Sequence, residues 1–176
     1  MLADWHERRP QDVRAKSASE LLRDWFASIL VLSTTFNFRP ALGQTYYLYC
    51  RDGDWQLSLV APQEWRGRAP GACLGQCELR SDMTWALEPV DDLDAHPTLG
   101  AELEKLIEGF TAELEGDGSL GEHLPGYRRE LPYYQRMLAT ALGTSLRAST
   151  GADVNLEAPV RALLESAGEA PLRLRG

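Results

Sequence analysis

The stretch QTYYLYCRDGDWQLSLVA, from Gln44 to Ala61, decides how this chain folds. Tyrosine, leucine and valine recur with a period of two on either side of Asp52-Gly53, a dipeptide typical of two-residue hairpin turns. The stretch therefore predicts two antiparallel strands joined at this turn. The turn also sets their register, with the cross-strand pairs Arg51–Asp54, Cys50–Trp55, Leu48–Leu57 and Tyr46–Leu59.

Alternation along the strands gives the predicted hairpin two different faces. One face is wholly apolar and is expected to pack against the core: Tyr46, Leu48, Cys50, Trp55, Leu57 and Leu59. The other combines aromatic rings with hydrogen-bonding groups: Tyr47, Tyr49, Arg51, Asp54, Gln56, Ser58 and Val60. We expect C-terminal helices to cover this second face; if they do not, its composition is that of a recognition surface.

Signals around the hairpin predict an α+β fold. Upstream, Ser17 and Glu20 have the spacing of a capping box, and the apolar residues that follow at helical intervals predict a helix over 19–34. Downstream, alternating patterns predict two more strands, with Cys73, Cys77 and Leu79 on one side of the first and Met83, Trp85 and Leu87 on one side of the second. We therefore expect a four-stranded antiparallel meander with the N-terminal helix on one face and C-terminal helices packed around it.

The chain after the sheet is expected to be helical. Apolar residues recur at helical spacing over 99–114, Pro132 suits the first turn of a third helix, and Pro159 opens a short fourth helix. Residues 116–126 are expected to form a flexible loop. We expect one domain over residues 1–176, with an extended surface lead-in (1–16), a core of helix and sheet (17–90) and a helical C-terminal part (91–176).

Composition bounds the class of protein. A chain of 176 residues with 44% hydrophobic and 25% charged residues is long and apolar enough to fold without disulfide bonds or structural metal ions. Its net charge of −8 disfavours nucleic acid and anionic membrane surfaces as partners. The longest apolar stretch, 25–32, is too short to cross a bilayer. Three cysteines and no apolar leader indicate a reducing cytoplasm, where we expect a monomer or a weak homodimer.

Candidate catalytic and metal motifs lack the context that their chemistry requires. Gly116, Gly118 and Gly121 have the spacing of a dinucleotide-binding loop, but they follow a predicted helix and not a strand. Cys73 and Cys77 on one face of a strand would lie roughly 13 Å apart, too far for one metal ion. The histidines, His6, His96 and His123, fall in predicted loops or in the N-terminal tail. We expect no catalytic residue, no metal and no cofactor.

Two short motifs carry a family resemblance. Pro62-Gln63-Glu64-Trp65 follows the hairpin, and Asp82-Met83-Thr84-Trp85 stands between the last two strands. With Phe36-Asn37-Phe38 and Tyr46-Tyr47-Leu48-Tyr49, they make residues 19–89 resemble the domain of unknown function DUF2452, a family found in bacteria and eukaryotes. The resemblance implies no activity and no cofactor. The stretch 66–70 is longer and more basic than the resemblance leads us to expect.

Two functions remain open. The first is a non-catalytic binding or adaptor domain for a protein or a small molecule, with candidate contact residues on the second hairpin face and among the tryptophans: Tyr47, Tyr49, Gln56, Ser58, Trp65 and Trp85. The same tryptophans are also suited to a packed core. The second is an enzyme that acts on a small polar substrate at the loops around Glu64, Cys73 and Asp82. A cleft lined by converging titratable groups would favour the enzyme.

Overall fold

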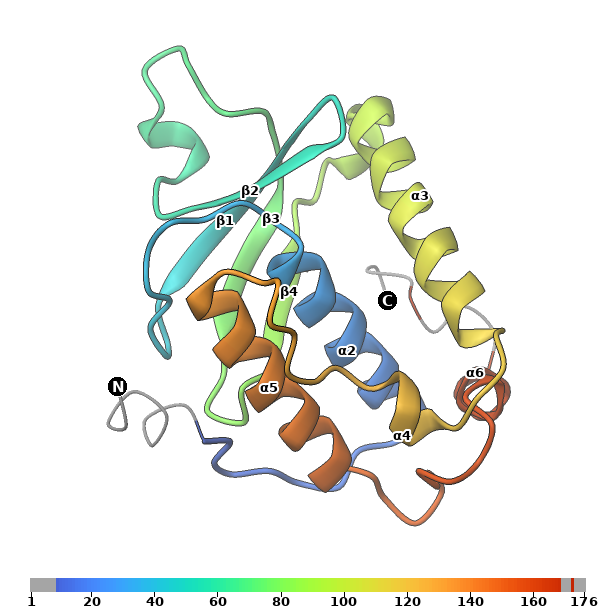
Figure 1. The fold of residues 1–176 in the computed structure, drawn as a ribbon. Helices are drawn as coiled ribbons and strands as arrows, with labels where there is room; N and C mark the ends of the chain where they lie inside the picture. The colour runs from blue at the N-terminus through green and yellow to red at the C-terminus, as the bar shows by residue number, and fades with distance from the viewer. Residues whose placement is uncertain (1–8, 169–171, 173–176) are drawn as a thin grey trace.

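The computed structural model describes residues 9–168 and Leu172, and it confirms the α+β class (Figure 1). Its elements follow in this order: α2 (Ala18–Leu32), β1 (Thr45–Arg51), β2 (Asp54–Ser58), the 3-10 turn η1 (Pro62–Glu64), β3 (Ala72–Leu79), β4 (Trp85–Pro89), the 3-10 turn η2 (Leu93–Ala95), α3 (Pro97–Leu114), α4 (Leu120–His123), α5 (Tyr133–Ala148) and α6 (Arg161–Ala167).

Helix α2 is the centre of the structure. Ser17 caps it and Glu20 completes the predicted capping box, with the Ser17 hydroxyl accepting from the Glu20 backbone N–H. Ten of its 15 residues are buried, more than one stripe of a surface helix would bury. The reason is that α2 packs against β4 on one side and against α5 and α6 on others. Its Trp25 and Phe26 rings also contact Phe110 of α3.

The four strands form the predicted antiparallel sheet, but their order is β2-β1-β3-β4. In a meander, β3 would follow β2 at its free edge. Here the connection 59–71 crosses β1, so β3 pairs with the other side of β1 and leaves β2 at the edge. The predicted meander is therefore wrong in strand order. A crossing of this kind depends on long-range pairing that local periodicity does not report.

The predicted hairpin register is confirmed from the turn to the middle of the strands. Arg51 pairs with Asp54 and Leu48 with Leu57. The pairing stops at Tyr47–Ser58 and the predicted pair Tyr46–Leu59 does not form, because β2 ends at Ser58 and the chain turns away. Leu59, which we expected on the core face, is instead 50% exposed.

A β-bulge in β3 changes the side to which Cys73 points. Gly75 pairs with Leu48 and Cys73 pairs with Tyr49, so Leu74 is the extra residue between them. Leu74 is fully buried in the core, and Cys73 shares the face of Tyr49. The prediction that Cys73 and Cys77 lie on one face is therefore wrong.

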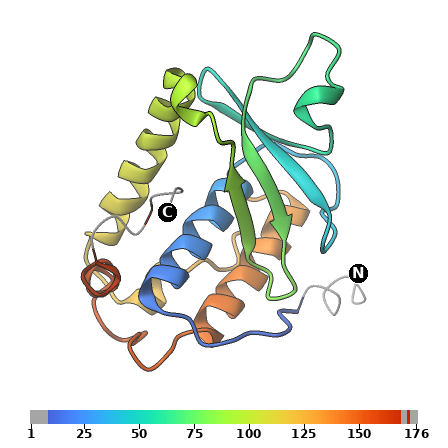
Figure 2. The same cartoon turned by 180° about the vertical axis from the view of Figure 1, so that it is seen from behind.

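The C-terminal helices pack on the same side of the sheet as α2. Figure 1 shows α5 beside α2, with α3 and α6 beyond it, and Figure 2 shows β3 and β4 in front of these helices. Side chains of α3, α5 and α6 join one core with Tyr46, Leu48 and Leu57. We call the opposite side of the sheet the outer face. The prediction that C-terminal helices cover the outer face is wrong.

Two local features complete the fold. The predicted loop 116–126 contains the short helix α4, which Ser119 caps in a second capping box with Glu122. The end of the predicted surface lead-in (1–16) does not stay on the surface, since Lys16 is 4% exposed. No helix in the described part of the chain is long and apolar enough to cross a membrane.

Candidate functional site

The outer face of the sheet is partly covered by the segment 59–71, which we call the crossing loop. Near its start lies the motif Pro62-Gln63-Glu64-Trp65, whose first three residues form a tight 3-10 turn. The Glu64 carboxylate accepts from the Ala61 backbone N–H at 2.7 Å, and the Glu64 N–H donates to the Ala61 carbonyl at 3.0 Å. The turn directs Trp65 back towards β1, where its indole N–H donates to the Tyr49 hydroxyl.

Tyr49 anchors the crossing loop to the sheet. Its hydroxyl accepts from the Trp65 indole N–H at 3.0 Å and donates to the Val60 carbonyl at 2.8 Å. The two rings meet edge to face with centroids 6.0 Å apart. Burial raises the pKa of Tyr49 to about 12, so the hydroxyl keeps its proton at physiological pH. Tyr49 is 1% exposed, and it therefore positions the loop and does not meet a partner directly.

Three further contacts fix both ends of the crossing loop. The Ser58 hydroxyl accepts from the Val60 N–H at 3.1 Å. The Arg51 guanidinium donates to the Ala69 carbonyl. Gly71 lies so close to β1 that a Cβ at this position would be 2.2 Å from the Cys50 carbonyl oxygen. Between these tethers, residues 66–68 form the apex of the loop.

The apex and its surroundings present aromatic, aliphatic and cationic groups to solvent. Tyr47 and Trp65 are half-buried, and Leu59 is 50% exposed. Arg66 and Arg68 are exposed, and within the described residues neither makes a hydrogen bond or an ion pair. Aromatic residues and arginine are enriched in the energetic centres of protein interfaces. The outer face is therefore a candidate interface.

Five of the six sequence-predicted contact residues lie on this face, in two different roles. Tyr49 and Ser58 are buried and position the loop, whereas Gln56 is exposed and Tyr47 and Trp65 are half-buried. The sixth, Trp85, does not lie there. It is on the core face, 1% exposed, with its ring 5.7 Å from that of Tyr46, and its indole Nε1 has no partner among residues 9–168 and Leu172.

The residues of the predicted enzyme site do not converge. Cys73 and Asp82 lie at opposite ends of β3, and the Glu64 carboxylate is engaged by the Ala61 N–H. Burial raises the pKa of the Cys73 thiol, which keeps it protonated and a poor nucleophile. Asp82 caps the β3–β4 turn, accepting from the Thr84 N–H at 3.0 Å and the Thr84 hydroxyl at 2.6 Å.

Asp82 also belongs to a buried ion cluster that the sequence reading missed. The Lys16 ammonium group lies 2.7 Å from the Asp82 carboxylate and 2.7 Å from that of Asp24 on α2. Arg80 reaches Asp24 at 3.1 Å from the surface side. Asp24 sits among the apolar positions of α2, and a charged residue on such a stripe was the signal of a buried cation. The expectation that Lys16 lies along the surface is wrong.

The ion cluster has a structural role and connects three segments of the chain. Burial alone would raise the pKa of Asp82, but hydrogen bonds from Lys16 and Thr84 outweigh it and lower that pKa. The Lys16 side chain is 2% exposed and those of Asp24 and Asp82 are 12% exposed, so a substrate has little access. The cluster holds the N-terminal segment, α2 and the β3–β4 turn together.

Comparison with known families supports the assignment drawn from the two short motifs. The model of the family described as a protein of unknown function, DUF2452, matches residues 13–108. The chain belongs to this family. The DUF2452 match includes Lys16, α2, the whole sheet and the crossing loop, and it ends inside α3. No solved structure matches the chain.

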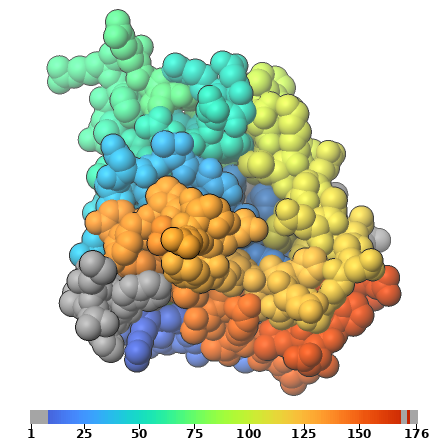
Figure 3. Space-filling view, in the orientation of Figure 1, coloured from blue at the N-terminus to red at the C-terminus, as the bar shows by residue number. Residues whose placement is uncertain are grey.

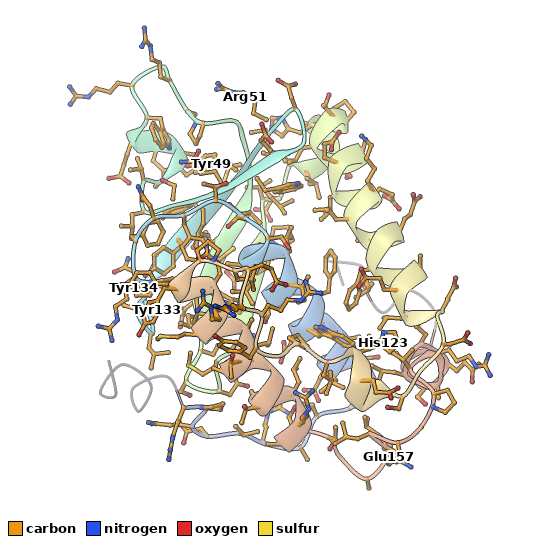
Figure 4. All side chains as sticks on the ribbon, viewed as in Figure 1. Tyr49, Arg51, His123, Tyr133, Tyr134 and Glu157 are labelled. Atoms are coloured by element: carbon orange, nitrogen blue, oxygen red, sulfur yellow. The ribbon has the colours of Figure 1, made fainter. Side chains whose placement is uncertain are left out.

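Beyond the DUF2452 match, a polar cavity of about 230 Å³ lies between the start of α4 and the segment before α6. Asp117, Ser119, Glu157 and Arg161 line it, and His123 nearby is within 2.7 Å of the Asp117 carbonyl. Figure 4 shows His123 and Glu157 on the side of the molecule away from Tyr49. The glycines of this segment shape a turn, since Gly118 has φ 112° and accepts from the Val160 N–H.

Metal-binding residues do not gather in the part of the chain that the structure describes. Among residues 9–168 and Leu172, no group of three histidine, cysteine, aspartate or glutamate side chains could hold an ion. Cys50, Cys73 and Cys77 are free thiols. Burial raises the pKa of all three, so each favours its neutral form.

Proposed function

We propose that this protein is a non-catalytic binding domain that docks a partner protein on the outer face, at the crossing loop. One observation carries the proposal: a loop tethered at both ends presents an apex whose arginines have no partner within the described residues. Holding a loop in place before binding lowers the entropy lost on association. The family match includes this loop, so the proposal applies to the DUF2452 region.

The chemistry of the apex suggests what such a partner would bring. Arg66 and Arg68 favour carboxylates, and Leu59 with the half-buried rings of Tyr47 and Trp65 favours an apolar side chain. Apart from Tyr47 on β1, these groups stand on the crossing loop and not inside a cleft, which suits a protein better than a small molecule. We therefore favour a protein partner over nucleic acid, in line with the net charge of the chain.

The proposal also includes a reducing compartment. The three thiols Cys50, Cys73 and Cys77 are unpaired, and two of them are buried. Unpaired buried thiols are common in cytoplasmic proteins, where the redox state keeps them reduced. We propose that the protein works in the cytoplasm, as a monomer or a weak homodimer.

The test compares surface variants that leave the fold intact. Purified wild type and an Arg66→Glu/Arg68→Glu variant are coupled to resin and exposed to a lysate of the source organism. Arg23→Glu serves as a control because it changes an exposed arginine of α2 away from the loop. Captured proteins that wild type and control retain and the loop variant loses are then purified and titrated against all three by calorimetry.

The proposal predicts at least one protein with this pattern and a loss of affinity of about tenfold or more in the loop variant. The melting temperature of all three proteins should agree, because every changed side chain is exposed. If each captured protein binds the loop variant as tightly as wild type, the crossing loop is not the docking surface.

A further inference from the structure

A second surface with interface chemistry lies outside the family match, at the start of α5. Tyr127 is 58% exposed and Tyr133 is 38% exposed, and Arg128 and Arg129 beside them are also exposed. We call these four residues the tyrosine–arginine patch. Figure 4 shows Tyr133 with its neighbour Tyr134 at the edge of the molecule. Figure 3 shows the orange segment that carries the patch standing forward on the surface.

The loop that carries the patch is held by Arg136 of α5. Its guanidinium donates to the carbonyls of Arg129 and Leu131, both at 2.9 Å, and contacts the Tyr127 hydroxyl at 3.4 Å. The guanidinium carbon also lies 5.6 Å from the centre of the Tyr127 ring, within reach of a cation–π interaction. One half-buried arginine side chain thus fixes the backbone and one ring of the patch.

The charge of the patch is positive in a strongly acidic protein. Arg136 donates its hydrogen bonds to neutral groups, and these bonds do not neutralise its positive charge. Its Nε is buried and has no partner among the described residues. The one carboxylate nearby in sequence, Glu130, lies 3.7 Å from Arg128, and both side chains are about 70% exposed. Residues 127–136 therefore hold three arginines and one glutamate.

From the positive charge and the exposed aromatic rings of the tyrosine–arginine patch, we infer that the patch binds an acidic segment of a partner protein. Carboxylates of the partner would pair with Arg128 and Arg129, and Tyr127 and Tyr133 would pack on its side chains. Tyrosine and arginine together are the residues most often found at interface hot spots. Aromatic rings and guanidinium groups also suit single-stranded nucleic acid, but in this structure Arg128 already pairs with a carboxylate, that of Glu130.

A labelled polymer tests this inference without knowledge of the natural partner. The probe is a fluorescein-labelled random copolymer of glutamate and tyrosine, titrated with full-length protein and followed by fluorescence anisotropy. We expect wild type to bind, and Arg128→Glu/Arg129→Glu to weaken binding by about tenfold or more. Tyr127→Ser/Tyr133→Ser should weaken it as well, and sodium chloride should weaken binding of the wild type.

The variant Arg66→Glu/Arg68→Glu separates this surface from the crossing loop. It removes the arginines of the crossing loop, which also pair with carboxylates under the proposed function, so the titration is repeated in this background. Adding Arg128→Glu/Arg129→Glu to it should weaken copolymer binding further by about tenfold or more. Absence of wild-type binding, or no further loss when the patch arginines are reversed in this background, would overturn the inference. Tighter binding of a fluorescein-labelled single-stranded DNA, lost in Arg128→Glu/Arg129→Glu, would assign the patch to nucleic acid instead. Equal melting temperatures exclude misfolding as the cause of a loss.

Discussion

At the scale of single residues, Lys16 joins segments that are distant in sequence. Its ammonium group bridges Asp24 and Asp82, and its backbone N–H donates to the Ser149 carbonyl at the end of α5. A buried ammonium is stable only when carboxylates compensate its lost hydration. The position of the N-terminal segment is therefore tied to the same group that orders the β3–β4 turn.

Replacing Lys16 by methionine should destabilise the fold strongly. The change keeps the aliphatic stem and removes the ammonium between the Asp24 and Asp82 carboxylates, which leaves only Asp24 with a cation, Arg80, at a cost of about 3–5 kcal/mol. Urea unfolding followed by tryptophan fluorescence measures the free energy. The control is Arg14→Ala, which removes an exposed ion pair with Glu20 and should leave the midpoint unchanged within error. Equal midpoints for both variants would show that the buried pairing contributes nothing.

The same cluster predicts how stability depends on pH. The pKa of Asp82 in the folded protein lies below its ordinary value of 3.8, so the folded state favours the carboxylate. This contribution is complete above pH 3.8 and is lost as the pH falls towards the lower folded pKa. Melting temperatures between pH 6 and pH 2.5 should therefore fall more steeply below about pH 4 in wild type than in Asp82→Asn. Parallel curves would contradict the prediction.

At the scale of elements, local sequence determined the register of the hairpin but not the end of its second strand. Asp52-Gly53 fixed the register because a two-residue turn allows one pairing. The end of β2 was not predictable from alternation, since Leu59 continues the pattern but leaves the sheet. The chain departs there because Val60 is engaged by Ser58 and Tyr49, contacts that exist only once the crossing loop is folded.

Two leucines of this hairpin should differ sharply in their effect on stability. Leu57 is 1% exposed, so Leu57→Ala should cost about 2–5 kcal/mol through lost burial and a cavity. Leu59 is two positions along the same chain and 50% exposed, so Leu59→Ala should cost less than about 0.5 kcal/mol. Chemical denaturation of the two variants checks both values. A large loss at Leu59 would mean that β2 continues beyond Ser58.

The bulged strand β3 makes a prediction at a glycine. A Cβ at Gly75 would lie 2.1 Å from the Glu88 carbonyl oxygen of β4, so Gly75→Ala should disrupt the pairing of these strands and lower the melting temperature. Gly100 in α3 has open space at its Cβ position. There, alanine should stabilise the helix by about 0.5–1 kcal/mol. Calorimetric melting of both variants tests this difference: the melting temperature should fall for Gly75→Ala and rise for Gly100→Ala.

Most elements were predictable, and most contacts between them were not. The capping box at Ser17 and the helical spacing over 99–114 are local signals, and both helices formed where expected. Strand order, the bulge at Leu74 and the fold of the crossing loop depend on residues far apart in sequence. The same is true of the candidate interface, whose aromatic residues were identified from the hairpin register while its arginines stood outside that register.

At the scale of the whole molecule, charge is distributed unevenly. Residues 91–117 hold nine carboxylates and one lysine, a formal charge of −8 that equals the net charge of the whole chain. The remaining residues are neutral in sum, and both arginine surfaces lie outside the acidic segment. An argument from net charge alone therefore describes the average field and not the field near Arg66 or Arg128. Beyond about 10 Å, physiological salt screens the acidic helix from such sites.

The enclosure of α2 has a consequence for the slowest motions of the protein. The sheet and the C-terminal helices pack around this helix, so its backbone amides have no local route to solvent. In deuterated buffer, the amides of residues 22–31 should exchange last, with protection equal to the free energy of global unfolding. Amides near Gly67 at the apex of the crossing loop should exchange orders of magnitude sooner. Early exchange in α2 would show that the part of the chain beyond residue 108 unfolds locally, independently of the region that the family model matches.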